Sequence, residues 1–223
     1  MGQDSIAIFG AGGFGREVAF WIEDCQQAYN SMQAVCFVDD DPAKQGTMQN
    51  GLPIIGLGAV RERFPQAKIL SGIGSPSLRQ RLMEKAAAAG FEFATMIHPR
   101  TELSRWVEIG PGAVICAGCK MTTNIVLGEH VQLNMDCTIG HDVVMGDYTT
   151  LAPGVHVSGY VHFGKRVYVG TGAVFVHGTE AEPLIIEDDA VIGAGACVIR
   201  PVGAGTTVAG IPAKPLPRKR NQA

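Results

Sequence analysis

The second half of the chain repeats an apolar position every six residues. From Ile97 to Phe175, fourteen consecutive hexads carry an apolar residue in this column, and a second column of small or β-branched residues runs from Thr101 to Thr179. A period of six fits neither an α-helix, at about 3.6 residues per turn, nor a simple hairpin sheet. It predicts a parallel β-helix in which each hexad forms one side and three hexads form one turn.

The repeat breaks once, at 177–183, and resumes at Ile186 with the frame shifted by five residues. We therefore expect a loop near 177–185 that projects from the coil. The segment from 209 onward is rich in proline and leaves the repeat, so it is expected to form a C-terminal tail. These features predict an all-β domain over 96–223.

The first ninety-five residues have a different pattern. Short apolar runs at 5–9, 34–38 and 68–71 predict strands, and helical spacing follows at 16–25 and 78–89. Alternating strands and helices predict a small Rossmann-like α/β domain over 1–95, with a parallel sheet of three or four strands.

A glycine-rich turn joins the first predicted strand to the first helix. Gly10, Gly12 and Gly15 match G-x-G-x-x-G in the setting where glycines let a phosphate approach a helix N-terminus. Asp39 or Asp40 ends the next strand, where a carboxylate could bind a ribose hydroxyl. The domain has room for a mononucleotide rather than both halves of an NAD site. The alternative is that the glycines only permit a tight turn.

All six histidines lie in the repeat or at its edge, and none occupies either apolar column. We therefore expect each of them on the outer surface or at a corner of the coil. His141 differs from the others because Asp142 follows it directly, and a carboxylate can orient an imidazole and keep it basic. Adjacent residues often point apart, so this pairing is a hypothesis.

Composition narrows the possible partners. The net charge is −3, and the chain has no long run of basic residues before Arg218–Arg220. This composition argues against binding to nucleic acid or to an acidic membrane surface. The apolar stretches are too short for membrane insertion, and the start lacks the order of a signal peptide, so we expect a cytoplasmic protein. Cys116 and Cys119 form a CxxC, but Cys119 and Cys137 fall in the small-residue column, which favours packing over a metal or redox site.

The hexads resemble those of the hexapeptide acyltransferases, whose parallel β-helix is left-handed. The segments 6–17 and 209–214 make the whole chain similar to a narrower group, the bacterial nucleotide-sugar N-acetyltransferases and their sialic-acid O-acetyltransferase relatives. This resemblance, and not the period, implies the left hand. It also implies a homotrimer that binds acetyl-CoA between neighbouring coils and a nucleotide-linked amino sugar on the N-terminal domain.

The resemblance also implies roles for particular residues. His141 and Asp142 match the catalytic motif, and the backbone N–H of Gly159 matches the group that holds the thioester carbonyl. Thr150 stands where some relatives carry a second histidine, so no role is transferred there. The implied nucleotide-sugar contacts are Gly12, Gly13, Phe14, Gly15, Asp39, Asp40, Gly72, Ile73 and Gly74. The implied coenzyme A contacts are Gly159, Gly172, Ala173, Gly193, Ala194, Ile211, Pro212 and Lys214.

The expected reaction is direct attack by the amine of a GDP- or UDP-linked amino sugar on the thioester, in synthesis of O-antigen or another surface glycan. O-acetylation of a sugar hydroxyl is the alternative within the same chemistry. Two alternatives belong to other classes of protein. One is a non-catalytic hexapeptide scaffold, which would fail to bind coenzyme A, and the other is a dehydrogenase built on the glycine motif, which would bind NAD. Neither acylation of the enzyme nor a metal is required.

Overall fold

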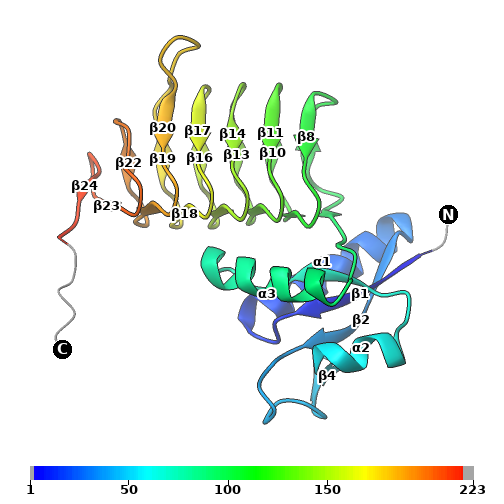
Figure 1. The fold of residues 1–223 in the computed structure, drawn as a ribbon. Helices are drawn as coiled ribbons and strands as arrows, with labels where there is room; N and C mark the ends of the chain where they lie inside the picture. Colours follow the sequence, from blue (N-terminus) through cyan, green and yellow to red (C-terminus); the bar gives the residue numbers. More distant parts are fainter. Residues whose placement is uncertain (1–2, 218–223) are drawn as a thin grey trace.

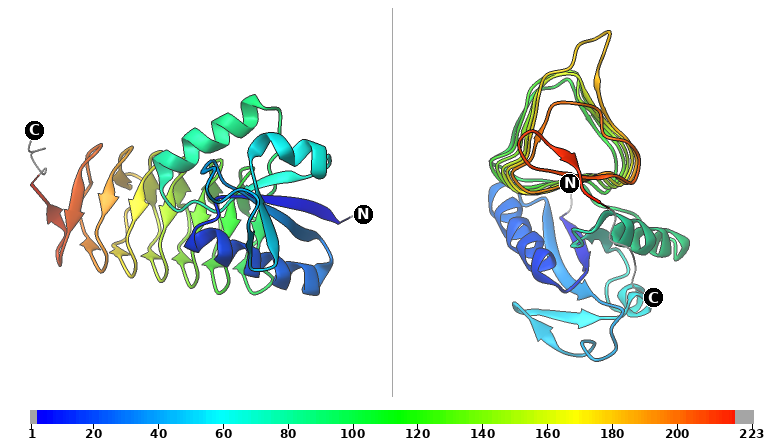
Figure 2. Two further views of the ribbon diagram at one scale, coloured as in Figure 1. Left: turned by 90° about the horizontal axis from the view of Figure 1, so that it is seen from below. Right: turned by 90° about the vertical axis from the view of Figure 1, so that its left-hand side faces the viewer.

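The computed structural model describes residues 3–217, which form an α/β unit followed by a long coil of short strands (Figure 1). Seen along its axis, the coil has a triangular cross-section, and the α/β unit packs along one of its three sides (Figure 2). The fold class therefore agrees with the expectation of a Rossmann-like unit joined to a hexapeptide β-helix.

The α/β unit has a five-stranded sheet in the order β3-β4-β2-β1-β5. Four strands are parallel, and the short β3 pairs antiparallel with β4. The predicted sheet of three or four strands missed this hairpin, because β3 has only two residues and no apolar alternation. The elements are β1 (Asp4–Phe9), β2 (Met32–Val38), β3 (Met48–Gln49), β4 (Leu52–Ile55), β5 (Lys68–Ser71), α1 (Gly13–Tyr29), α2 (Leu57–Arg63) and α3 (Pro76–Ala88).

The coil has three sheets, which we call the first, second and third faces. The first face contains β7 (Glu102–Leu103), β10 (Lys120–Met121), β13 (Thr138–Ile139), β16 (His156–Val157), β19 (Val174–Phe175) and β22 (Cys197–Val198). The second contains β8 (Val107–Ile109), β11 (Ile125–Leu127), β14 (Val144–Met145), β17 (Val161–Phe163) and β20 (Leu184–Ile186). The third contains β6 (Met96–Ile97), β9 (Val114–Ile115), β12 (Gln132–Leu133), β15 (Thr150–Leu151), β18 (Tyr168–Val169), β21 (Val191–Ile192), β23 (Thr207–Ala209) and β24 (Lys214–Pro215).

Both apolar columns of the hexad point into the coil. Paired strands are eighteen residues apart in the regular part, as for Lys120 and Thr138, so one turn contains three hexads. Inward residues such as Ile115, Leu133 and Val169 are fully buried in one continuous core. The open first turn is the exception, because Leu103 is 40% exposed. The buried thiols of Cys119 and Cys137 belong to the same core.

The chain leaves the coil between β19, which ends at Phe175, and β20, which begins at Leu184. This segment projects from one corner of the triangle (Figure 2), and it includes Thr179, which the hexad count had placed in a column. At the C-terminal end, β23 still continues the third face through Ala209. The chain then folds back, so that β24 pairs antiparallel with β23.

The α/β unit is held on the third face by Arg79 of α3, whose side chain is fully buried. Its guanidinium donates hydrogen bonds to the carbonyls of His130, Ile73 and Gly74, to the Gln132 side chain, and to the carbonyls of Tyr148 and Thr149. Burial lowers the pKa of this guanidinium to about 9. The same side chain therefore ties the Ile73–Gly74 loop to the coil backbone.

Two histidines are buried by this packing, contrary to the expectation that all six would be exposed. His98 is 2% exposed, and its Nε2 lies 2.9 Å from Asp24 of α1. His130 is 3% exposed, with its ring stacked on Tyr148 and edge-on to Phe93. Both point away from the coil core, but the α/β unit covers them. Among residues 3–217, no helix has the length and apolar character needed to cross a membrane.

Candidate active site

The corner between the first and second faces, which we call the first corner, contains 122–124, 140–142 and 158–160 on successive turns. The last residue of each group has a positive φ: 54° at Asn124, 57° at Asp142 and 56° at Tyr160. Asn and Asp tolerate this left-handed conformation better than most residues. This conformation turns the chain from the first face to the second, and its repetition aligns the side chains of successive turns along the corner.

His141 and Asp142 face each other, as the sequence hypothesis required. His141 Nδ1 lies 2.7 Å from Asp142 Oδ2, and Asn124 Nδ2 donates to Asp142 Oδ1 at 3.2 Å. Hydrogen bonds from His141 and from the Asn124 and Tyr160 side chains hold the pKa of Asp142 below its usual range. Because the ionised carboxylate accepts only, Nδ1 of His141 is the donor and Nε2 carries the lone pair. A neutral imidazole held in this way can accept a proton from a substrate.

Gly159 lies one turn further along the corner, directly beneath the His141 ring. A Cβ at this position would stand 2.6 Å from Cε1 and 2.7 Å from Nε2 of His141, so only glycine leaves room for the imidazole. Within residues 3–217, the backbone N–H of Gly159 has no hydrogen-bond partner. This donor is therefore free to bind an oxygen atom close to the basic nitrogen.

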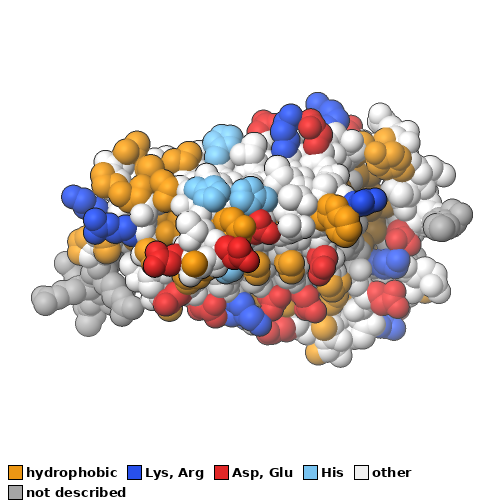
Figure 3. Space-filling view, turned by 90° about the horizontal axis from the view of Figure 1, so that it is seen from above, with side chains coloured by type: hydrophobic (Ala, Val, Ile, Leu, Met, Phe, Trp, Pro, Cys, Tyr) orange, Lys and Arg blue, Asp and Glu red, His pale blue; other side chains and the backbone are white. Residues whose placement is uncertain are grey.

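Three residues that sequence reasoning missed complete this corner. Asn124 and Tyr160 lie one turn on either side of Asp142, and His177 lies two turns after His141, with its Nε2 3.4 Å from His141 Nε2. One step of eighteen residues from Asp142 leads to Asn124 and Tyr160, and two such steps from His141 lead to His177. Figure 3 looks onto this side of the molecule, where histidine side chains gather along the coil.

The glycine-rich turn and the loop after β5 pack against each other. A Cβ on Gly15 would stand 1.9 Å from the Gly10 carbonyl oxygen, and one on Gly72 would stand 2.5 Å from the Gly15 Cα. Close packing thus explains glycine at these three positions. Gly12 and Gly74 differ, because a Cβ there would meet nothing within 4 Å. They border open space and are the loop glycines most available to a ligand.

The two acidic residues after β2 have different partners. Asp39 accepts hydrogen bonds from the backbone N–H of Ala11, at 3.4 Å, and from Lys44, so it borders the glycine-rich turn. Asp40 pairs with Lys85 of α3 at 2.7 Å. The structure therefore brings Asp39, but not the Asp40 carboxylate, to the predicted nucleotide loop.

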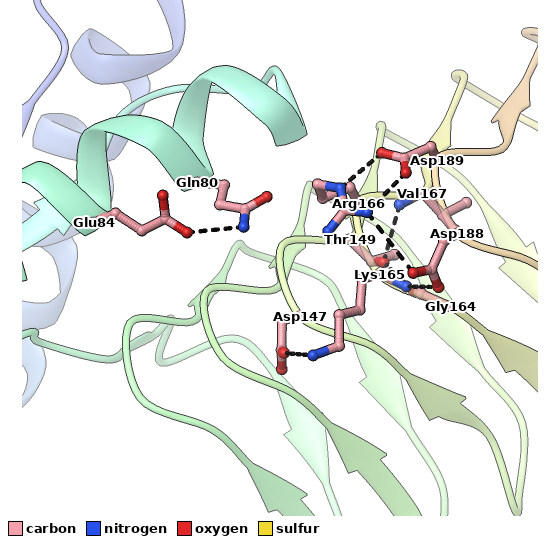
Figure 4. Close-up of polar contacts among 10 residues, drawn as sticks. All are labelled: Gln80, Glu84, Asp147, Thr149, Gly164, Lys165, Arg166, Val167, Asp188 and Asp189. Atoms are coloured by element: carbon pink, nitrogen blue, oxygen red, sulfur yellow. Dashed lines mark hydrogen bonds and ion pairs between the residues drawn. The ribbon is translucent and has the colours of Figure 1, made fainter. Parts of the chain in front are cut away.

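A cavity of about 590 Å³ opens beside Gly74, between the start of α3 and the third face. Ser75 and Ser77 line it from the α/β unit, and Tyr168 and Arg166 line it from the coil. Arg166 is held by both oxygens of Asp189, at 2.7 Å each (Figure 4). The cavity therefore has the predicted nucleotide loop on one side and the Arg166–Asp189 ion pair of the coil on the other.

Apart from Gly159, the residues predicted to bind coenzyme A lie elsewhere, on successive turns of the corner between the third and first faces. Gly172 and Ala194 are exposed there, and Ile211 is 81% exposed on the next turn. Pro212 and Lys214 follow, and Gly193 packs against Ala209. Ala173 points into the core, so only its backbone is available. Within residues 3–217, no cluster of three His, Cys, Asp or Glu side chains could hold a metal ion.

Fold and site together define a hexapeptide-repeat transferase with an N-terminal α/β domain. Residues 5–86 match the family model of the PglD N-terminal domain, and 124–159 match the model of the bacterial transferase hexapeptide. The chain belongs to the family of sugar N-acetyltransferases that includes the GDP-perosamine N-acetyltransferase of Escherichia coli O157:H7. The two are 35% identical over 213 residues, which are 95% of this chain and 96% of that protein.

Solved structures agree with this assignment over nearly the whole chain. WeeI from Acinetobacter baumannii AYE superposes with a TM-score of 0.88 at 33% identity, over 96% of this chain and all of that one. PerB from Caulobacter crescentus, solved in complex with CoA and GDP-perosamine, superposes with a TM-score of 0.84 at 28% identity, over 96% and 97% of the two chains.

Proposed function

We propose that this protein transfers an acetyl group from acetyl-CoA to the amino group of a nucleotide-linked sugar. GDP-perosamine is the first candidate substrate, since the E. coli relative is named for it and the PerB complex contains it. A cytoplasmic role in making lipopolysaccharide or another surface glycan is part of the same proposal. The observation that carries it is the imidazole of His141, oriented by Asp142 beside the free N–H of Gly159.

In the proposed reaction, the neutral amine attacks the thioester carbonyl carbon. The carbonyl oxygen becomes negative, and the Gly159 N–H stabilises it; one such donor is worth roughly 3 kcal/mol in other enzymes. His141 Nε2 accepts the proton that the nitrogen loses, and the C–S bond breaks with its electron pair leaving on sulfur. No residue is acylated.

We propose Gly12, Gly13, Phe14, Gly15, Asp39 and Gly72–Gly74 as the nucleotide site. The open space at Gly12 and Gly74, the proximity of Asp39 and the neighbouring cavity support this assignment. For Asp40, a substrate contact would require the carboxylate to leave Lys85.

We further propose that the active unit is a homotrimer. The α/β unit with the nucleotide loops packs on the third face, whereas His141 lies at the corner between the other two faces. Figure 2 shows the α/β unit along one side of the triangular coil. The proposed coenzyme A residues other than Gly159 lie on another corner. A single chain thus keeps the three parts of the site apart, and a neighbouring coil packed against the first or second face would bring them together. Light scattering during gel filtration should give three times the chain mass, and a monomer would contradict the proposal.

The function is tested with purified protein, acetyl-CoA and a panel of GDP- and UDP-linked sugars. We expect thiol release only when the sugar has a free amine, and the product should carry the acetyl group on nitrogen. The matched control is the analogue with a hydroxyl in place of the amine. Acetylation of that hydroxyl at a similar rate would indicate an O-acetyltransferase, and failure to bind coenzyme A in calorimetry would favour a scaffold.

A further inference from the structure

His177 reaches the His141 ring from two turns away, because the residue between them is glycine. Residues 141, 159 and 177 are equivalent positions on three successive turns of the first corner. Adjacent strands are separated by about 4.8 Å, so neighbours two turns apart are normally screened by the side chain between them. Gly159 has none, and the Nε2 atoms of the two histidines lie 3.4 Å apart.

Hydrogen bonding defines the tautomer of both rings. Nδ1 of His141 donates to the Asp142 carboxylate, and Nδ1 of His177 donates to the Gly178 carbonyl. In neutral rings both Nε2 atoms would therefore be acceptors, and two lone pairs facing each other repel. The contact becomes favourable when a single proton lies between the two nitrogens. The geometry of the first corner therefore favours one proton held between Nε2 of His141 and Nε2 of His177.

We propose that His177 is a positioning residue that shares, and then removes, the proton collected by His141. This inference rests on the proposed function. As the amine nitrogen bonds to the acetyl carbon, its proton moves to His141 Nε2, and the electron pair of the C–S bond leaves with the thiolate. Nε2 of His177 then accepts the proton from His141 Nε2. The exposed His177 ring passes a proton to water, so both rings return to their neutral forms.

The surroundings of the pair fit this role. Tyr160 stands edge-on to both rings, with its centroid 5.2 Å from that of His141 and 5.8 Å from that of His177. The negative charge of Asp142 stabilises a cationic pair, and Glu180 of the projecting loop adds a second negative charge near Tyr160. Asn124 holds Asp142 from the other side. Arg200 occupies the equivalent position one turn after His177, whereas no lysine or arginine is among the groups that shift the pKa of Asp142 or Tyr160.

The test compares His177→Phe, which keeps a ring without nitrogen, with Glu182→Gln, an exposed change in the same loop. We expect His177→Phe to lower kcat about tenfold or more, the lower part of the range for proton-transfer groups. KM for the nucleotide sugar should change little. In mixtures of H₂O and D₂O, the wild-type rate should depend on deuterium content along a curve, because two protons move. In His177→Phe the dependence should become linear, because only the transfer from the amine to His141 remains. Added imidazole should restore turnover to His177→Ala and leave Glu182→Gln unaffected.

A measurement without substrate separates this inference from the proposed function. When the pH is lowered enough to add one proton to the imidazole pair, NMR of the wild-type protein should show a low-field imidazole N–H resonance that disappears in His177→Phe and in His141→Ala but persists in Glu182→Gln. The inference is overturned if this resonance is missing from the wild type, whatever the substrate proves to be. It is equally overturned if His177→Phe turns over acetyl-CoA as fast as Glu182→Gln does.

Discussion

At the scale of single residues, the orientation of the His141 ring depends on Asp142 on one side and on the missing side chain of Gly159 on the other. Asp142 can face His141 because its φ of 57° turns the chain back at the corner. Adjacency in the sequence did not predict this, since extended neighbours point apart. The pair itself could be identified from the sequence, whereas Asn124, Tyr160 and His177 emerge only when the eighteen-residue turn that the hexads predict is applied to that pair.

Replacing His141 by alanine should remove the proton acceptor and leave the nucleotide loops intact. We expect kcat to fall by about 10²–10⁴, while KM for the nucleotide sugar changes little. Initial rates of thiol release measure both. Near-normal turnover in this variant would exclude His141 as the base.

Replacing Gly159 by alanine should act through geometry. The added Cβ would stand 2.6 Å from the His141 Cε1, so the ring must move and kcat should fall at least tenfold, with little change in melting temperature. Gly58→Ala is the matched control, because a Cβ there meets nothing within 4 Å and lies in α2. Equal activity of the two variants would show that the close approach of Gly159 to His141 is unimportant.

At the scale of elements, the hexad period predicted which side chains fill the coil, because one register repeats over many turns. It could not predict what covers the coil from outside. His98 and His130 are outward positions by register, yet they are buried by α1, α3 and the residues around them. Burial of this kind depends on the docking of a separate unit, which leaves no period in the sequence.

A substitution at Arg79 tests how α3 is held against the third face of the coil. Arg79→Met removes the donor for six acceptor groups on the loop and the coil, so the free energy of unfolding should fall by roughly 3 kcal/mol. Arg81→Met is the control, because Arg81 is exposed on the same helix, and its effect should stay within about 0.5 kcal/mol. Urea unfolding measures both. Equal stability of the two variants would contradict a docking role for Arg79.

At the scale of the whole molecule, stability should depend on pH through His130. Burial and then the nearby Arg79 charge lower its pKa from 6.5 to about 4. Between these values the unfolded chain binds more protons than the folded one, so stability decreases as pH falls from 6.5 towards 4, by roughly 3 kcal/mol at most. Above pH 6.5 this contribution is constant.

His130→Asn should flatten that dependence, because asparagine accepts the positive φ of 55° at this position but does not titrate. Melting temperatures measured across the same pH range give the slope, independently of any overall loss from the smaller side chain. An unchanged slope would exclude His130 as its source.

The central claim is that the amine of a nucleotide-linked sugar is acetylated at the first corner. It is tested most directly by a crystal structure with CoA and GDP-perosamine. We predict that the sugar amine lies within about 3.2 Å of His141 Nε2. The nucleotide should lie on the Gly12 and Gly74 loops and CoA should pass Gly172, with neighbouring chains together bringing both ligands to His141 and Gly159. An ordered sugar whose amine lies away from His141 would contradict the account.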